Sequence, residues 1–355
     1  MAAPGRCSGY LAHMTSRAFV GLLVAGAALS LPAYALAAGL PGDPCTTPGE
    51  VKPMGSGAIE CVNGAWAPST KQPGMAPAGT AATSTTSSSG GKQAKIFTTI
   101  GTALTPETFA SSGKQVADAS AVRLSDGRIR LISWVNPVGL RTATSTSPAG
   151  TAFTADPSTP LPSMAGQPRA MRIDASTIRL FYVSNGTIST AVSKDEGLTY
   201  TEQGPVITTE QAGFEPGTLG IVRQGNVYRG YFSNLEKPGQ RSERIMRTAT
   251  STDLLHWTMG PKLSIAGSHP FPLIDKKGRI ALYYAADGSS GYGIYVSTSK
   301  NAVSFSGTKL VLAGAGDPDI VSVGRDKWLL YYGTEVSPAL GFGIKVAKSI
   351  GNPIP

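Results

Sequence analysis

Residues capable of acid-base chemistry recur at one place in a repeated pattern. Five stretches each begin with a polar residue, which proline follows in four of them; the five residues are Asp118, Gln167, Glu215, His269 and Asp317. Three of the five are carboxylic acids. Two carboxyl groups roughly 6.5–9.5 Å apart suit inverting glycoside hydrolysis, in which one protonates the leaving oxygen and the other activates water. The alternative is that these residues only begin strands beside an axial water channel.

The stretches that follow these residues share one pattern. Each has an alternating run, a tight polar turn and an aliphatic or aromatic run, as in 317–332, and this is typical of two antiparallel strands joined by a hairpin. A third strand-like segment follows in every copy, as in 188–193 and 344–348. The five starts are 49, 48, 54 and 48 residues apart. A period near fifty residues in an all-strand pattern indicates a solenoid or a propeller.

We predict an all-β, five-bladed β-propeller over residues 95–355. The first four copies leave room for a fourth strand, as in 305–310, whereas the fifth ends at Pro355 without one. A strand-like run at 95–101 belongs to no copy, and propellers commonly close the ring with a strand from the other terminus. Because first strands line a propeller's axis, the five leading residues are predicted to face one central pocket.

The N-terminal region resembles a signal peptide. Arg6 and Arg17 precede an apolar run at 18–31, and small residues end at Ala37, so we predict cleavage after Ala37 and a signal peptide over 1–37. An uncleaved membrane anchor is the alternative, which Pro32 disfavours. The mature protein is expected to be secreted, periplasmic or on the cell surface, without a membrane segment.

Two further segments precede the repeats. Cys45 and Cys61 lie in a small module predicted over 38–67, where one disulfide would stabilise the fold by roughly 3 kcal/mol. Metal binding by these two cysteines alone is disfavoured. Residues 68–94 are rich in Ser, Thr, Ala, Gly and Pro, which predicts a flexible linker.

The distribution of charge along the chain does not indicate a nucleic-acid partner. The net charge of +9 falls to +7 when Arg6 and Arg17 are removed, and the remaining basic residues are scattered singly. Without a nucleic-acid motif, this pattern predicts a solvated surface with some affinity for anionic polymers rather than a nucleic-acid site. We expect a monomer.

Two other motifs favour a structural role. Residues 193–200 fit the Asp-box, S-x-D-x-G-x-T-aromatic, and 251–257 form a looser S-x-D-x-x-x-W version. In such turns the aspartate accepts backbone hydrogen bonds and the aromatic residue packs beneath. Asp195, Asp253 and His256 are therefore poor candidates for catalysis.

Together, the five leading residues, the hairpin repeats and the S-x-D-x-x-x-W turn resemble the five-bladed furanosidase propellers, which are arabinanases, β-xylosidases and arabinofuranosidases of glycoside hydrolase family 43 with invertase and levansucrase relatives. The resemblance implies a carbohydrate substrate, with Asp317 as base, Glu215 as acid and His269 as a central residue that can associate with calcium. It requires the blades to be rotated relative to chain order, and Gln167 replaces an aspartate that modulates the acid. In unrotated order Asp118 would be the base and His269 would occupy the acid's place.

Further substrate-binding candidates are expected near these residues. They are Arg169, for a carboxylate or hydroxyls, and four aromatic residues that could rim the pocket or pack in the core, Trp134, Phe214, Phe271 and Tyr292.

Two other functions remain open. One is a non-catalytic carbohydrate-binding or adhesin propeller, which a blocked axis or salt-bridged carboxylates would favour. The other is a sialidase, which would need six blades.

Overall fold

The structure, a computed structural model, describes residues 46–49, 51–54, 57–69, 96–157, 165–235 and 244–355. The predicted signal peptide (1–37), Cys45 and residues 70–94 of the predicted linker lie outside the described residues. Within the described ranges, no helix is both long and apolar enough to cross a membrane.

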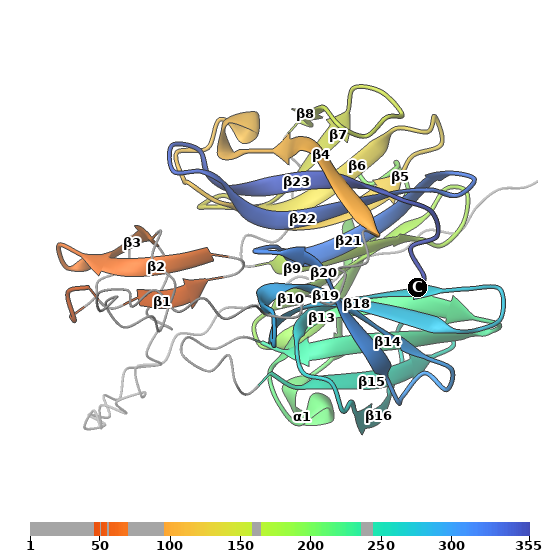
Figure 1. Cartoon of the computed structure of the whole chain (residues 1–355). Helices are drawn as coiled ribbons and strands as arrows, with labels where there is room; N and C mark the ends of the chain where they lie inside the picture. The colour runs from red at the N-terminus through yellow and green to blue at the C-terminus, as the bar shows by residue number, and fades with distance from the viewer. Residues whose placement is uncertain (1–45, 50, 55–56, 70–95, 158–164, 236–243) are drawn as a thin grey trace, which may run out of the picture. The chain divides into compact units, whose positions relative to one another are not determined.

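Five antiparallel sheets of four strands form the repeats (Figure 1). Blade one contains β5 (Val116–Arg123), β6 (Ile129–Val135), β7 (Gly139–Ser145) and β8 (Phe153–Ala155). Blade two contains β9 (Gly166–Arg172), β10 (Ile178–Ser184), β11 (Thr187–Ser193) and β12 (Thr201–Ile207). Blade three contains β13 (Pro216–Gln224), β14 (Val227–Asn234), β15 (Met246–Ser251) and β16 (Thr258–Lys262). Blade four contains β17 (Ser268–Ile274), β18 (Ile280–Gly288), β19 (Gly291–Ser299) and β20 (Ser306–Ala313). Blade five contains β21 (Gly316–Gly324), β22 (Lys327–Ser337), β23 (Gly341–Ser349) and β4 (Phe97–Leu104). Two short helices, a 3-10 turn (Pro106–Phe109) and α1 (Thr209–Ala212), lie between strands.

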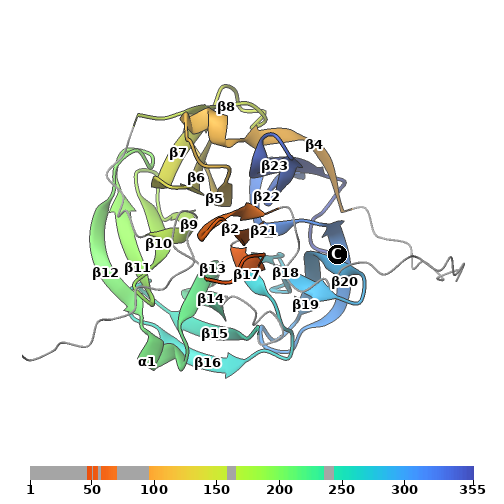
Figure 2. The same ribbon diagram turned by 90° about the vertical axis from the view of Figure 1, so that its left-hand side faces the viewer.

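The first strands of the five blades form a closed ring (Figure 2). Each lies beside the first strand of the next blade, in the order β5, β9, β13, β17, β21 and back to β5. The predicted five-bladed β-propeller is therefore confirmed. The count of five also argues against the sialidase alternative, which would need six blades.

Strand β4 closes the ring as predicted. It pairs with β23 in antiparallel register, with Phe97 opposite Ser349 and Gly101 opposite Val346. Phe97 is buried, and its ring packs edge-on against Tyr283 of blade four at a centroid distance of 6.1 Å. The closing strand therefore joins the two ends of the propeller through backbone pairing and core packing together.

Local sequence explains the hairpins, and packing between blades explains the core. Asn185 and Gly186 both have positive φ angles, 50° and 71°, as the tight turn between β10 and β11 requires. Alternating apolar residues face the neighbouring blades, so the core consists of five clusters that each draw on two adjacent blades. The ring is therefore held by apolar contacts between sheets, because each blade alone has two uncovered faces.

A separate three-stranded sheet contains β1 (Val51–Met54), β2 (Gly57–Val62) and β3 (Ala65–Ser69). Cys61 of β2 is buried. Its predicted partner, Cys45, lies outside the described residues, so the pairing stays a prediction.

Candidate active site on the propeller axis

A β-bulge at the start of the first strands places the leading residues. The pairing register shifts between Ala117 and Ser120, between Ser268 and Phe271, and between Gly316 and Asp319. The leading residues at the bulges have left-handed backbones, with φ of 55° at Asp118, 49° at Gln167, 52° at His269 and 52° at Asp317. Such angles are uncommon outside glycine, and strained backbones of this kind cluster at functional sites.

Three of the leading side chains meet at the axis. His269 Nε2 lies 3.3 Å from Asp118 Oδ1, and His269 Nδ1 lies 3.2 Å from Asp317 Oδ1. The exposed fractions are 6% for Asp118, 3% for His269 and 1% for Asp317. One imidazole from blade four therefore stands between carboxylates from blades one and five. We call these three residues the axial cluster.

The expected equivalence of Glu215 with the other leading residues is wrong. In blade three the register shift falls between Pro216 and Leu219, so Gly217 occupies the bulge position. Glu215 lies two residues earlier, just before β13 begins. The Glu215-Pro216 pair imitates the polar-proline pattern of the other blades, and only the pairing of β13 with β14 reveals the shift.

The side chains of Glu215 and Gln167 lie where blades two and three adjoin. The backbone carbonyl of Glu215 accepts a hydrogen bond from Leu235 N at 2.7 Å. A Cβ added at Gly186 would lie 3.9 Å from Glu215 Cγ, which places the Glu215 side chain beside the β10–β11 turn. Gln167 Oε1 accepts a hydrogen bond from Thr218 Oγ1 at 3.0 Å. The amide of Gln167 therefore reaches toward blade three.

Arg169 spans the axis beside the axial cluster. Its guanidinium donates to the carbonyls of Ala119, Pro168 and Pro318 at 3.4, 3.2 and 3.1 Å, which belong to blades one, two and five. It also lies 3.7 Å from Asp319 Oδ2. Arg169 was predicted to hold a substrate carboxylate or hydroxyls, but in the structure it is buried and holds groups of the protein itself.

Asp319 is a buried acid that the sequence pattern does not single out, because it lies inside the first strand of blade five, two residues after Asp317. Its Oδ2 accepts a hydrogen bond from Ser120 Oγ at 3.0 Å. Burial raises the pKa of the Asp319 carboxyl to about 6, although the charge of Arg169 opposes this rise. Burial likewise lowers the pKa of Arg169, against the attraction of Asp319, Asp317 and Asp118. The buried arginine therefore faces three carboxylates, those of Asp319, Asp317 and Asp118.

A cavity of about 330 Å³ lies on the far side of Arg169 from the axial cluster. Arg169, Asp319 and Phe271 line it, together with residues near the ends of the first strands, such as Val122 and Ile221. Phe271 was a candidate for sugar binding beside His269, but it faces this cavity. The Arg169 guanidinium lies over the Phe271 ring, 6.0 Å from the ring centre. Arg169 and Asp319 thus separate two axial regions of different character.

The other three aromatic residues predicted to bind sugar make contacts within the protein. Trp134 packs against the core between blades one and two, and Phe214 packs against Phe232 at a centroid distance of 5.7 Å. Tyr292 lies under the guanidinium of Arg244, 5.9 Å from the ring centre. Arg244 also donates to the Ala285 carbonyl at 3.4 Å, opposite Ser268 in the blade-four register. The sequence gives no sign of this buried arginine, because it lies in no repeat or motif.

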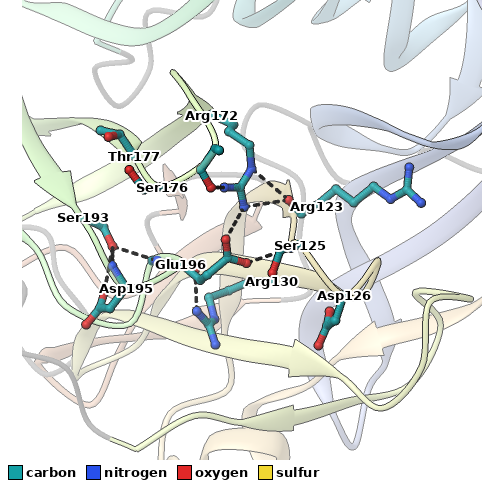
Figure 3. A network of polar contacts seen from close by, with 12 residues as sticks. Arg123, Ser125, Asp126, Arg130, Arg172, Ser176, Thr177, Ser193, Asp195 and Glu196 are labelled. Atoms are coloured by element: carbon teal, nitrogen blue, oxygen red, sulfur yellow. Dashed lines mark hydrogen bonds and ion pairs between the residues drawn. The ribbon is translucent and has the colours of Figure 1, made fainter.

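The turn at 193–200 of blade two, which fits the Asp-box pattern, forms hydrogen bonds with blade one (Figure 3). Asp195 Oδ1 accepts hydrogen bonds from Leu198 N and Thr199 N at 3.1 and 2.9 Å. The adjacent Glu196 accepts from Ser125 N at 2.8 Å and pairs with Arg172 at 3.0 Å. These contacts use the carboxylates within the protein, as expected for a structural turn.

The looser turn of blade three is built in the same way. Asp253 Oδ1 accepts from Leu255 N and His256 N at 2.8 Å each, while Asp253 Oδ2 contacts His256 Nδ1 at 2.7 Å. Trp257 is buried beneath the turn, in the core between blades two and three.

The axial cluster offers acid-base groups and cation ligands. One carboxylate oxygen of Asp118, one of Asp317 and a ring nitrogen of His269 all lie within 4.8 Å of one another, so together they could hold a metal ion. Calcium prefers six to eight oxygen ligands, and this trio supplies carboxylates from only two residues. Calcium would therefore need further oxygens from water or substrate.

Comparisons with known proteins identify the class of fold. No protein-family model matches the sequence, and no curated protein sequence matches it. Solved structures do match. An α-L-arabinofuranosidase from Podospora anserina, solved with cellotriose, has a TM-score of 0.55 at 10% identity, over 72% of this chain and 97% of that one.

Two further structures agree. The catalytic domain of a family 62 α-L-arabinofuranosidase from Coprinopsis cinerea has a TM-score of 0.55 at 12% identity, over 72% of this chain and 97% of that one. A thermostable family 43 glycoside hydrolase has a TM-score of 0.51 at 14% identity, over 65% of this chain and 88% of that one. The fold is therefore the five-bladed propeller found in glycoside hydrolases of families 43 and 62.

Proposed function

We propose that the protein is a glycoside hydrolase that binds a glycan over the axial cluster. The observation that carries this proposal is the convergence of Asp118, His269 and Asp317, from three blades and through three equivalent bulges, within 4.8 Å at the axis. A buried group of ionisable side chains on strained backbone is costly to maintain and is typical of functional sites. The fold supports a carbohydrate substrate, because solved structures with a similar fold include a glycoside hydrolase and an α-L-arabinofuranosidase.

In the proposed mechanism, Asp317 is the base and Glu215 the acid. Asp317 would remove a proton from a water molecule that attacks the anomeric carbon. Glu215 would give its proton to the leaving oxygen, so that the bond to the sugar breaks as the bond to water forms. His269, in contact with Asp317 at 3.2 Å, would hold the base in position and moderate its charge. Glu215 is only partly buried, which leaves it accessible to a substrate.

The test is a hydrolysis screen with matched variants. Oligosaccharides with furanose and pyranose units are incubated with the wild-type protein, Glu215→Gln and Asp317→Asn. Loss of a catalytic acid or base is expected to lower the rate about 10²–10⁴-fold. The controls are Glu210→Gln, in the short helix before Glu215, and Asp326→Asn, in the exposed hairpin of blade five. Unchanged hydrolysis by both site variants would remove Glu215 and Asp317 from the mechanism.

A second function is a carbohydrate-binding propeller without catalysis. It is favoured by one observation: both carboxylates of the axial cluster contact the same imidazole and are buried. Calorimetric titration with the same oligosaccharides separates the two proposals. Binding without hydrolysis, weakened in Asp317→Asn but not in Asp326→Asn, would support the binding protein or adhesin.

We also propose that the chain is exported and that residues 1–37 are removed. The support is the sequence pattern of two arginines, an apolar run and small residues before Ala38. N-terminal sequencing of protein recovered from outside the cytoplasm tests this. A chain that still begins with Met1 would contradict it.

A further inference from the structure

A groove with several lysines lies at the other end of blades four and five from the axial cluster. Its volume is about 920 Å³, and its lining includes Lys276, Lys277, Lys300, Asp326 and Trp328. The lysines at 276 and 277 occupy the hairpin that follows β17, whereas His269 stands near the start of the same strand. Asp275 lies six positions after His269, and six steps of extended strand span roughly 20 Å.

The charge of this groove is only partly balanced. Its side chains include four cations, Lys276, Lys277, Arg279 and Lys300, and two carboxylates, Asp275 and Asp326, for a net charge of +2. Asp275 forms an ion pair with Arg279, with 3.1 Å between Arg279 Nε and Asp275 Oδ2. Arg279 also donates to the carbonyl of Pro355 at 2.6 Å.

The three lysines are available to a ligand. Their side chains are exposed, and none of them has a hydrogen bond or ion pair within the part of the chain that the structure describes. The nearest other carboxylate of the groove, Asp326, is itself exposed at the tip of the β21–β22 hairpin. The groove therefore presents three ammonium groups and one exposed carboxylate around a concave surface, with a net charge of +2.

Trp328 gives the groove an aromatic wall. Part of this half-buried side chain packs against the core between blades four and five, while the rest lines the groove. An aromatic face suits the apolar side of a sugar ring, and the core contact would hold it in a fixed orientation.

A second hollow of about 350 Å³ adjoins this groove and shares Arg279 and Lys300 with it. The second hollow is lined by polar side chains, among them the exposed Ser304 and Ser306. Asn301 also lines it, and its Oδ1 accepts hydrogen bonds from Ser299 Oγ, Val303 N and Ser304 N within its own turn. The two hollows together offer cations, an aromatic face and many small hydrogen-bonding groups. That combination suits a ligand that carries both carboxylates and hydroxyls.

We propose that this groove binds an acidic oligosaccharide, of the class that contains uronic acids. Its carboxylates would pair with Lys276, Lys277 and Lys300, one ring would stack on Trp328, and hydroxyls would reach the side chains around Asn301. The free cations are all lysines, which act as point charges, while the one arginine is occupied by Asp275 and Pro355. Bidentate recognition of phosphate, which arginine provides, is therefore not offered, and this favours an acidic glycan over a nucleic acid.

The test measures binding directly and does not depend on hydrolysis. A short galacturonic acid oligomer is titrated by calorimetry into the full chain and into Lys276→Gln/Lys277→Gln/Lys300→Gln. A matched control, Lys262→Gln/Lys309→Gln/Lys348→Gln, removes the same charge from exposed strand positions elsewhere on the propeller. The groove variant is expected to bind about tenfold more weakly, since each exposed ion pair contributes a fraction of a kcal/mol, and the control to bind as the wild type does.

Four further measurements sharpen the result. The carboxyl-reduced oligomer should bind about tenfold more weakly than the acidic one, and added salt should weaken only the acidic one. Ligand binding should change the fluorescence of the wild-type protein, and this change should disappear in Trp328→Phe. The groove variant should hydrolyse neutral oligosaccharides as the wild type does, which separates this site from the proposed active site.

Several outcomes would overturn the proposal. They are no binding at low salt, equal binding of the acidic and the reduced oligomer, and equal losses in the groove variant and its control. Tighter binding of single-stranded DNA than of the oligomer, lost in the same groove variant, would instead assign the surface to nucleic acid.

Discussion

Asp317 of β21 and His269 of β17 contact each other across two neighbouring blades, with 3.2 Å between Oδ1 and Nδ1. Both residues stand on bulges with left-handed backbone, so the contact depends on the register of both blades. His269 also contacts Asp118 at 3.3 Å, and one imidazole therefore separates two buried carboxylates.

Replacing His269 should destabilise the propeller strongly. His269→Ala leaves Asp118 and Asp317 facing each other in a buried site, and we expect the free energy of unfolding to fall by about 3–5 kcal/mol. His256→Ala is the matched control, because 89% of the His256 side chain is exposed and its contact with Asp253 lies at the surface. That variant should lose less than about 1 kcal/mol. Urea denaturation measures both, and similar losses would show that the axial imidazole does not hold the carboxylates together.

Arg169 should stabilise the folded propeller mainly through its contacts with Asp319 and with the backbone carbonyls of three blades. Arg169→Met leaves the buried Asp319 without its cation and three carbonyls without a donor, so we expect a loss of about 3–5 kcal/mol. The double variant Arg169→Met/Asp319→Asn should recover part of this loss, because the uncompensated charge is gone. A double-mutant cycle by urea denaturation gives the coupling energy. Strict additivity would mean that the 3.7 Å contact between the two side chains contributes nothing.

The stability of the protein should depend on the protonation of Asp319. Its folded-state pKa of about 6 lies above the ordinary 3.8, so the folded protein holds this proton more tightly than the unfolded chain does. The resulting stabilisation is complete below about pH 4 and is lost as the pH rises through about 6. Wild-type protein should therefore lose stability relative to Asp319→Asn across this range. Denaturation of both proteins between about pH 4 and pH 7 checks the slope, and a flat or rising difference would contradict the assignment.

The closing strand should be necessary for a stable ring. Phe97→Ala removes a buried ring that packs on Tyr283, and such a change is expected to cost about 3–5 kcal/mol. Ile100→Ala, on the same strand, alters a side chain that is 46% exposed and should cost about 1 kcal/mol or less. Thermal or urea unfolding compares the two variants. Equal costs would mean that backbone pairing alone, without core packing, secures the strand.

The sequence by itself determined the number of blades and the closing strand. Hairpins and alternating strands are local patterns, and five copies with a period near fifty residues left the strand-like run at 95–101 next to the repeats without a blade of its own. The structure places β4 there, paired with β23. The roles of Asp195 and Asp253 were also predictable, because an Asp-box turn is closed by hydrogen bonds within a few residues.

Only the tertiary structure decided which side chains share the axis. A polar residue followed by proline occurs at Glu215 as at Asp317, yet the bulge of blade three lies at Gly217. The position of a bulge depends on how two strands pair and not on the sequence of one strand. The partnership of Arg169 with Asp319, 150 positions further along the chain, likewise exists only because the ring brings blades two and five to one axis. Strand patterns follow from short-range preferences, but distances between blades follow from closure of the ring and from burial.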